Sequence, residues 1–195
     1  LQPLSHSMSQ APLVQAGLVL SLVAQGLFAQ GLIADLEPGR DASPSSMTSS
    51  GASIAGLAWF PANNREVGIE PYVSDGTPAG TRLLADLNPG AAPSQPRHFV
   101  PFGNGAAFTT AYPGALWVSD GTRAGTRQVG LMAGLEAPAA VGSQLFFWGF
   151  SAATGGELFV SDGTGAGTRL VVELVPGIQS AELTQFRASG AKLYF

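Results

Sequence analysis

Apolar residues along this chain come in short runs separated by glycine, proline and polar turn residues. The clearest run, Leu145-Phe146-Phe147-Trp148, is apolar at every position. A strand with one exposed face would alternate, so we expect this strand to be covered on both faces. Glycine or proline recurs every few residues, too often for a helix of useful length. The pattern therefore predicts an all-β fold.

Strands can be placed in the two best-preserved stretches of the chain, where each apolar run ends at a turn. The later stretch predicts strands over residues 144–149, 157–161 and 168–174, and the first strand of a following unit over 183–189. The earlier stretch predicts strands over residues 98–102, 106–110, 115–119 and 126–131.

These strands belong to a tandem repeat. Residues 157–177 read ELFVSDGTGAGTRLVVELVPG, residues 70–90 read EPYVSDGTPAGTRLLADLNPG, and residues 115–134 read ALWVSDGTRAGTRQVGLMAG. The aspartates of the three SDGT tetrads lie 45 and 42 residues apart. Four short strands within a period of this length are typical of one blade of a β-propeller.

The spacing predicts a partial β-propeller of about three four-stranded antiparallel blades. The blades occupy units of about 40–90, 91–134 and 135–177, and a truncated unit follows at 178–195. Closed propellers have roughly four to eight blades. The prediction is therefore a fragment of a larger ring, with residues 30–195 as the repeat region.

Residues 1–29 differ from the repeats. The apolar segment 16–23 is followed by Ala24-Gln25-Gly26, a small-x-small cleavage pattern. We interpret residues 1–29 as a signal peptide or, alternatively, as a degenerate leader, because no basic residue precedes the apolar segment. Glutamines interrupt the run, which disfavours a transmembrane anchor.

The Asp-Gly pair between two strands is the strongest short-range hairpin signal in a sequence. Aspartate accepts N–H bonds from residues just ahead of it, and glycine supplies a positive φ. The predicted structural turn residues are Asp75, Gly76, Asp120, Gly121, Asp162 and Gly163. Calcium binding by these aspartates is a weaker interpretation, because the unit lacks the close run of oxygen ligands that a calcium loop needs. We assign no other cofactor and no metal site.

An arginine follows each turn, at Arg82, Arg127 and Arg169, and an acid follows two of them four residues later, at Asp86 and Glu173. Residues i and i+4 of a strand point to the same face. This spacing predicts a salt link with a neighbour, and a role in the scaffold.

The octet Glu157-Leu158-Phe159-Val160-Ser161-Asp162-Gly163-Thr164 resembles the bacterial repeat family named after its ELWxxDGT signature. The two other copies are similar, but they place Pro71 where the family has leucine and Ala115 where it has glutamate. The resemblance covers roughly residues 31–195. It implies an exported bacterial repeat protein, secreted or at the cell surface, of propeller form and without established catalytic residues.

The charge and the cysteine content exclude some classes of partner and of metal site. The formal net charge is −4 and Lys192 is the single lysine, whereas nucleic-acid binding needs a basic stripe. We therefore expect no nucleic-acid partner. The chain has no cysteine, which excludes disulfides and thiolate metal sites.

No catalytic constellation is recognisable in the sequence. The histidines are His6 and His98, and no catalytic triad, zinc-protease motif or phosphate-binding loop occurs. A glycosidase needs two carboxylates that face each other across a cleft. Nothing in the spacing pairs the available glutamates, which are Glu66, Glu70, Glu136, Glu157 and Glu182.

Residues that break the repeat are the candidate ligand contacts, because loops on a rigid scaffold often carry function. They are Arg97 and His98 near a first strand, and Asn63, Asn64 and Arg65 in what we interpret as a polar insertion of the longest unit. Trp59 and Trp148 are expected to pack between blades. The sequence predicts a non-enzymatic scaffold whose loops bind a macromolecule or glycan at the cell surface. The alternative is a propeller-type glycoside hydrolase or lyase with acidic residues at a central channel.

Overall fold

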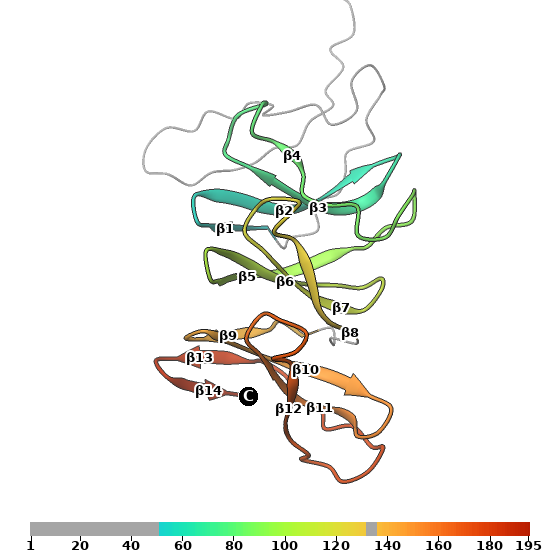
Figure 1. Ribbon diagram of the computed structural model, residues 1–195, viewed down its shortest axis with the longest axis vertical. Coiled ribbons are helices and arrows are strands. Elements are labelled where there is room, and N and C mark those ends of the chain that lie inside the picture. The colour runs from blue at the N-terminus through green and yellow to red at the C-terminus, as the bar shows by residue number, and fades with distance from the viewer. Residues whose placement is uncertain (1–50, 132–135) are drawn as a thin grey trace, which may run out of the picture.

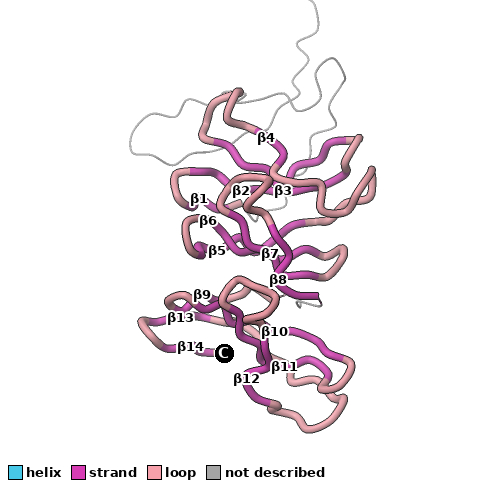
Figure 2. The backbone as a smooth tube through the Cα atoms, viewed as in Figure 1, coloured by secondary structure: helices cyan, strands magenta, loops and turns pink. Residues whose placement is uncertain are grey.

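The computed structural model describes residues 51–131 and 136–195, and within these ranges the chain forms strands and turns without a helix (Figures 1 and 2). The predicted all-β class is therefore confirmed. The predicted leader, residues 1–29, lies outside the described residues.

The strands form three four-stranded antiparallel sheets and one two-stranded sheet, each in chain order. The first sheet contains β1 (Ala52–Ile54), β2 (Leu57–Asn64), β3 (Gly68–Ser74) and β4 (Arg82–Leu83). The second contains β5 (Pro96–Phe102), β6 (Gly105–Thr110), β7 (Ala115–Ser119) and β8 (Arg127–Leu131). The third contains β9 (Ala139–Val141), β10 (Gln144–Ser151), β11 (Gly155–Ser161) and β12 (Arg169–Val172). The two-stranded sheet pairs β13 (Arg187–Ser189) with β14 (Lys192–Tyr194).

The strands predicted for the second and third sheets are present, with ends shifted by a few residues. The predicted strand over residues 183–189 is wrong in its first half, because only Arg187–Ser189 forms a strand. The N–H of Leu183 turns back to the carbonyl of Ala181, 3.1 Å away, and Gln185 has a φ of 57°. Because of this turn, pairing between β13 and β14 begins only at Arg187.

Consecutive sheets pack face to face through apolar clusters and form an open stack (Figure 1). Between the first and second sheets, Trp59 and Leu84 pack against Phe99 and Phe108. Between the second and third sheets, the buried residues are Ala107, Leu116, Val118, Val129, Leu145 and Phe147. Both faces of β10 are thus covered, because Phe146 and Trp148, on its other face, pack in a cluster with Phe186 and with Leu193 of β14. Trp59 and Trp148 pack between sheets, as predicted.

The first strands of successive sheets lie next to one another. Strand β1 contacts β5, β5 contacts β9, and β9 contacts β13. The four-stranded sheets are therefore stacked in the same orientation. In each of them the first strand lies in this row and the fourth strand lies farthest from it.

Candidate functional site

The three SDGT turns have the same internal hydrogen bonds. In the third sheet, Asp162 Oδ1 accepts the backbone N–H of Thr164 at 2.8 Å and its hydroxyl at 2.6 Å. Thr164 Oγ1 in turn accepts the N–H of Gly167 at 3.0 Å. The turns at Asp75 and Asp120 repeat these bonds. The aspartate side chain therefore holds the backbone of its own turn.

The second glycine of each turn lies against the aspartate. A Cβ built on Gly167 would overlap the Asp162 carboxylate, and Gly80 and Gly125 have the same relation to Asp75 and Asp120. Hydrogen bonds from the threonine two residues ahead, first from its hydroxyl and then from its N–H, lower the pKa of each aspartate. These carboxylates are ionised acceptors at neutral pH.

The second and third turns are also joined to the sheet before them. Arg82 Nη2 donates to the carbonyl of Gly121 at 2.7 Å, and Arg127 Nε donates to the carbonyl of Gly163 at 3.1 Å. Gly121 and Gly163 are buried, whereas the equivalent Gly76 of the first sheet is exposed. We call this arrangement, an arginine of one sheet on the Asp-Gly turn of the next, the corner joint.

The predicted salt link of these arginines and acids with a neighbour is replaced by bonds to the backbone. The arginine reaches the next sheet, and the acid bonds its own chain four residues ahead. Asp86 Oδ2 accepts the N–H of Gly90 at 3.3 Å, and Glu173 Oε1 accepts the N–H of Gly177 at 2.7 Å. The acid closes the turn after the fourth strand.

The glutamates at the start of the repeat are fully buried in β3 and β11. Glu70 accepts the N–H of Leu87 at 2.9 Å and the N–H and hydroxyl of Ser94 at 2.8 and 2.7 Å. Burial raises the pKa of Glu70, and these hydrogen bonds partly oppose the rise. Glu157 accepts the N–H groups of Leu174 and Val175 at 3.0 and 2.9 Å. Both carboxylates fasten the segment that follows the fourth strand onto the third strand.

The predicted contacts Arg97 and His98 lie on β5, where the ladder with β6 shifts register after Arg97. His98 has a φ of 57°, and its Nδ1 lies 3.1 Å from Thr109 Oγ1. Burial lowers the pKa of His98, the neighbouring Arg97 adds to this effect, and Glu136 opposes it. His98 is therefore a neutral, half-buried ring bound to its neighbouring strand.

The predicted contacts Asn63, Asn64 and Arg65 lie at the tip of the β2–β3 hairpin. This segment is not an insertion, because β2 and β10 both have eight residues and their hairpins both have three residues between strands. The Asn64 side chain accepts the N–H of Glu66 at 2.9 Å and so shapes the tip.

These two groups of residues lie along the same edge of the stack. A second–third hairpin and the start of the first strand fall at the same end of an antiparallel sheet, opposite the SDGT turns. The connection into β5 links the two sheets there, because Ser94 N–H donates to Ile69 O and Ser94 O accepts the N–H of Tyr112, both at 3.1 Å. We call the residues Asn63, Asn64, Arg65, Arg97, His98 and Tyr112 the hairpin edge.

Tyr112 was missed by the sequence reasoning. It lies between β6 and β7 and is 56% exposed to solvent. Its signal in the sequence is an aromatic residue next to Pro113 and Gly114, at a place where the other two units have no aromatic residue.

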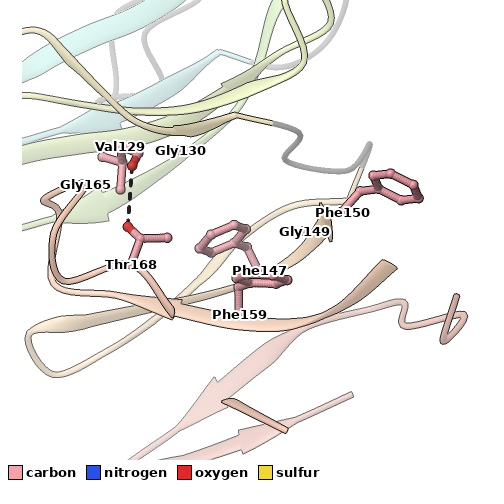
Figure 3. Close-up of a pocket in the computed structure, with 8 residues that line it drawn as sticks. All are labelled: Val129, Gly130, Phe147, Gly149, Phe150, Phe159, Gly165 and Thr168. Carbon is pink, nitrogen blue, oxygen red and sulfur yellow. Dashed lines mark hydrogen bonds between the residues drawn. The ribbon is translucent and has the colours of Figure 1, made fainter. Parts of the chain in front are cut away.

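A shallow cavity of about 200 Å³ lies between β8 and the third SDGT turn (Figure 3). Val129 and Gly130 line one side, and Gly165 and Thr168 the other, where Thr168 Oγ1 donates to Val129 O at 3.4 Å. Phe147 and Phe159 pack together at its floor, and Phe150 points away from them. It is smaller than the roughly 300–1,000 Å³ of ordinary ligand pockets, and its lining carries no charge. We interpret it as a packing gap beside the corner joint.

In the part of the chain that the structure describes, no three His, Cys, Asp or Glu residues are grouped to hold a metal ion. The same residues include no helix long and apolar enough to cross a membrane. Comparison with protein-family models, curated proteins and solved structures finds no match to this chain.

Proposed function

We propose that this chain is a non-enzymatic, exported scaffold whose hairpin edge binds a glycan or another macromolecule at the bacterial cell surface. The observation that carries the proposal is a difference between the recurring and the variable residues of the repeat. Charged residues that recur in the repeat bond the backbone, whereas residues that differ between repeats gather at the hairpin edge.

The recurring residues are engaged within the fold. Asp75, Asp120 and Asp162 bond their own turns, and Glu70 and Glu157 bond the segment after the fourth strand. The hydrogen bonds lower the pKa of the three aspartates, which makes them weak proton donors and weak bases near neutral pH. Glu70 and Glu157 are fully buried, out of reach of a substrate in solution. These contacts support a scaffold over the glycoside hydrolase or lyase.

The hairpin edge offers the side chains that a glycan-binding surface uses. Tyr112 presents an exposed ring, Asn63 an exposed amide and Arg97 a half-buried guanidinium. Aromatic rings supply rigid apolar contact area, and amides and guanidinium groups supply hydrogen bonds. This combination suits a polar ligand with apolar faces, such as a sugar.

We further propose that the three sheets are blades of a propeller of the ELWxxDGT-repeat type. Three features support this assignment: chain-order four-stranded sheets, adjacent first strands, and a corner joint that repeats between sheets. Export and cell-surface location follow from the resemblance and from the signal-like segment 16–23, and remain part of the proposal.

A glycan array and bacterial envelope polysaccharides, probed with the full chain, test the binding proposal. Tyr112→Ala and Arg97→Ala are expected to weaken saturable binding to a glycan, and Arg123→Ala, an exposed arginine on an SDGT turn at the opposite edge, is expected to leave it unchanged. Absence of any saturable glycan binding would overturn the glycan assignment, and equal loss in all three variants would overturn the hairpin edge as the binding site. Release of new reducing ends from a bound polysaccharide would instead favour the hydrolase.

A further inference from the structure

Arg97 belongs to the hairpin edge, and the fold gives its guanidinium no acceptor. Arg82 and Arg127 donate to backbone carbonyls of the next sheet. In the described part of the chain, no hydrogen bond or ion pair holds the guanidinium of Arg97, and its side chain is half-buried. A guanidinium carries five N–H donors in a planar fork. These donors are available to a ligand, in surroundings where part of their hydration is already removed.

The backbone around Arg97 is fixed by the second sheet. Arg97 pairs with Thr109 of β6, and Thr109 Oγ1 lies 3.1 Å from His98 Nδ1. His98 has a φ of 57°, and Gln185, which lies four residues before the end of β13 as His98 does before the end of β5, has the same value. The bulge is therefore common to both strands, whereas Thr184 stands where β5 has Arg97. The guanidinium is the part that is particular to the second sheet.

The exposed ring of Tyr112 lies at the same end of the second sheet. Its N–H donates to the carbonyl of Ser94, three residues before Arg97, at 3.1 Å. Because Arg97 pairs with Thr109 and Tyr112 follows three residues later, the two backbone positions lie on the order of 10 Å apart along the strand. A ligand of more than one sugar unit can therefore contact both side chains.

The other charges at this edge do not replace that of Arg97. Arg65 and Glu66 are adjacent in the β2–β3 hairpin and have opposite charges. Burial lowers the pKa of His98, so its ring is neutral near pH 7. Glu136 acts on His98 from the segment before β9, and among the described residues it forms no ion pair with Arg97. Arg97 thus supplies the fixed positive charge where the second sheet meets this edge.

We infer that the hairpin edge binds an acidic glycan, in which Arg97 receives a sugar carboxylate and Tyr112 packs on a sugar ring. The inference rests on the proposed function and adds the class of ligand. Arginine donates two parallel N–H bonds to a carboxylate, a geometry that a neutral hydroxyl group does not match. Half-burial strengthens the attraction, because the effective dielectric constant is lower than in water. The chain has a formal net charge of −4, so its overall charge does not attract polyanions.

The test is binding of the full chain to hyaluronan, alginate and polygalacturonate, each compared with its own carboxyl-reduced form. Reduction replaces the carboxylate by a neutral hydroxymethyl group and keeps the sugar backbone. Biolayer interferometry on immobilised polysaccharide is expected to show about tenfold tighter binding to the acidic form of at least one pair, because charged hydrogen bonds are gained. Added salt should reduce this difference.

Variants of the hairpin edge separate the two contacts. Arg97→Ala is expected to bind the acidic and the reduced form equally, whereas Tyr112→Ala should weaken both and keep their ratio. Arg97→Lys should retain only part of the preference, because it keeps the charge and loses the planar fork. Arg123→Ala, the exposed arginine of the opposite edge, is the matched control and should bind as the unchanged chain does.

Equal binding of the unchanged chain to the acidic and reduced forms of all three polysaccharides would overturn the inference and leave the proposed function standing. A preference that persists in Arg97→Ala would show that another group receives the carboxylate. Tighter binding to dextran sulfate than to every carboxylated polysaccharide would contradict the assignment to carboxylates. Absence of binding to any glycan, neutral ones included, would instead overturn the glycan assignment of the proposed function.

Discussion

Replacing Glu157 by glutamine tests whether the buried glutamates serve the fold. Glu157 is 0% exposed and accepts two backbone N–H groups, one on each carboxylate oxygen. Glutamine keeps the volume but turns one acceptor into an NH₂ donor that faces Leu174 or Val175 N–H. One charge-assisted bond, worth roughly 1.5–3 kcal/mol, is lost, and relief of the buried charge offsets a part. We expect the free energy of unfolding to fall by about 2 kcal/mol.

The assay is urea and thermal unfolding of the full chain, with Glu182→Gln as the matched control. Glu182 is exposed, and surface substitutions of this kind change stability by less than about 0.5 kcal/mol. In a chain of this size, 2 kcal/mol corresponds to a midpoint about 4–8 °C lower. Hydrogen exchange at Leu174 and Val175 should accelerate in Glu157→Gln. Equal stability of the two variants would refute the structural role of Glu157.

Three further predictions follow from the turns and the corner joint. Arg127→Ala removes the donor to the Gly163 carbonyl and is expected to lower the free energy of unfolding by about 1 kcal/mol, measured against Arg123→Ala in urea; equal effects would exclude the joint. The pKa values of Asp75, Asp120 and Asp162 are lowered in the folded state, so the unfolded state binds more protons once the pH falls through the ordinary aspartate value of about 3.9, and stability is lost below it. Triple Asp→Asn substitution should flatten this acid limb of the stability curve. Glu70, whose pKa is raised in the folded state, acts in the opposite sense: its contribution is present below its unfolded pKa and is lost as the pH rises through its folded pKa. Added calcium should leave the unfolding midpoint unchanged, because the turn aspartates bond their own backbone and hydroxyls; a rise that saturates with calcium would contradict this.

The strands were predictable because their signals are local. Apolar runs such as Leu145–Trp148 end at glycines and at Asp-Gly turns, and each turn is specified within about six residues. The internal bonds of Asp162 likewise join residues two positions apart. Because the same turn occurs three times in the chain, its signal could be recognised in three copies.

The partners of the charged residues were not predictable, because they lie far along the chain. Glu157 bonds residues 17 and 18 positions away, and Arg127 bonds Gly163, 36 positions away in the next sheet. Strand periodicity indicates which face Arg127 occupies but not which carbonyl covers that face.

The supposed insertion at Asn63–Arg65 shows a different error. With bounds of about 40–90 the first unit is the longest of the three, and the prediction assigns its extra residues to the hairpin. From Ala58 to Gly90 the first sheet matches the third, from Leu145 to Gly177, residue for residue in length. The extra residues of the first unit precede the second strand.

The central claim is that the Asp-Gly turns are joints between sheets. Gly76, Gly121 and Gly163 have φ values of 91°, 90° and 89°, so valine at each position suffers a similar backbone strain of roughly 1–3 kcal/mol. A Cβ at Gly76 meets nothing within 4 Å, whereas a Cβ at Gly121 lies 2.9 Å from Leu57 Cδ1 and one at Gly163 lies 2.8 Å from Phe102 Cε1. Leu57 and Phe102 belong to the preceding sheet in each case.

The most direct measurement is therefore the free energy of unfolding of three variants, Gly76→Val, Gly121→Val and Gly163→Val. We predict that the second and third lose at least about 1 kcal/mol more than the first, because the added side chain must also displace Leu57 or Phe102 of the preceding sheet. Equal losses at all three positions would show that the turns serve only their own hairpins, and would contradict the account.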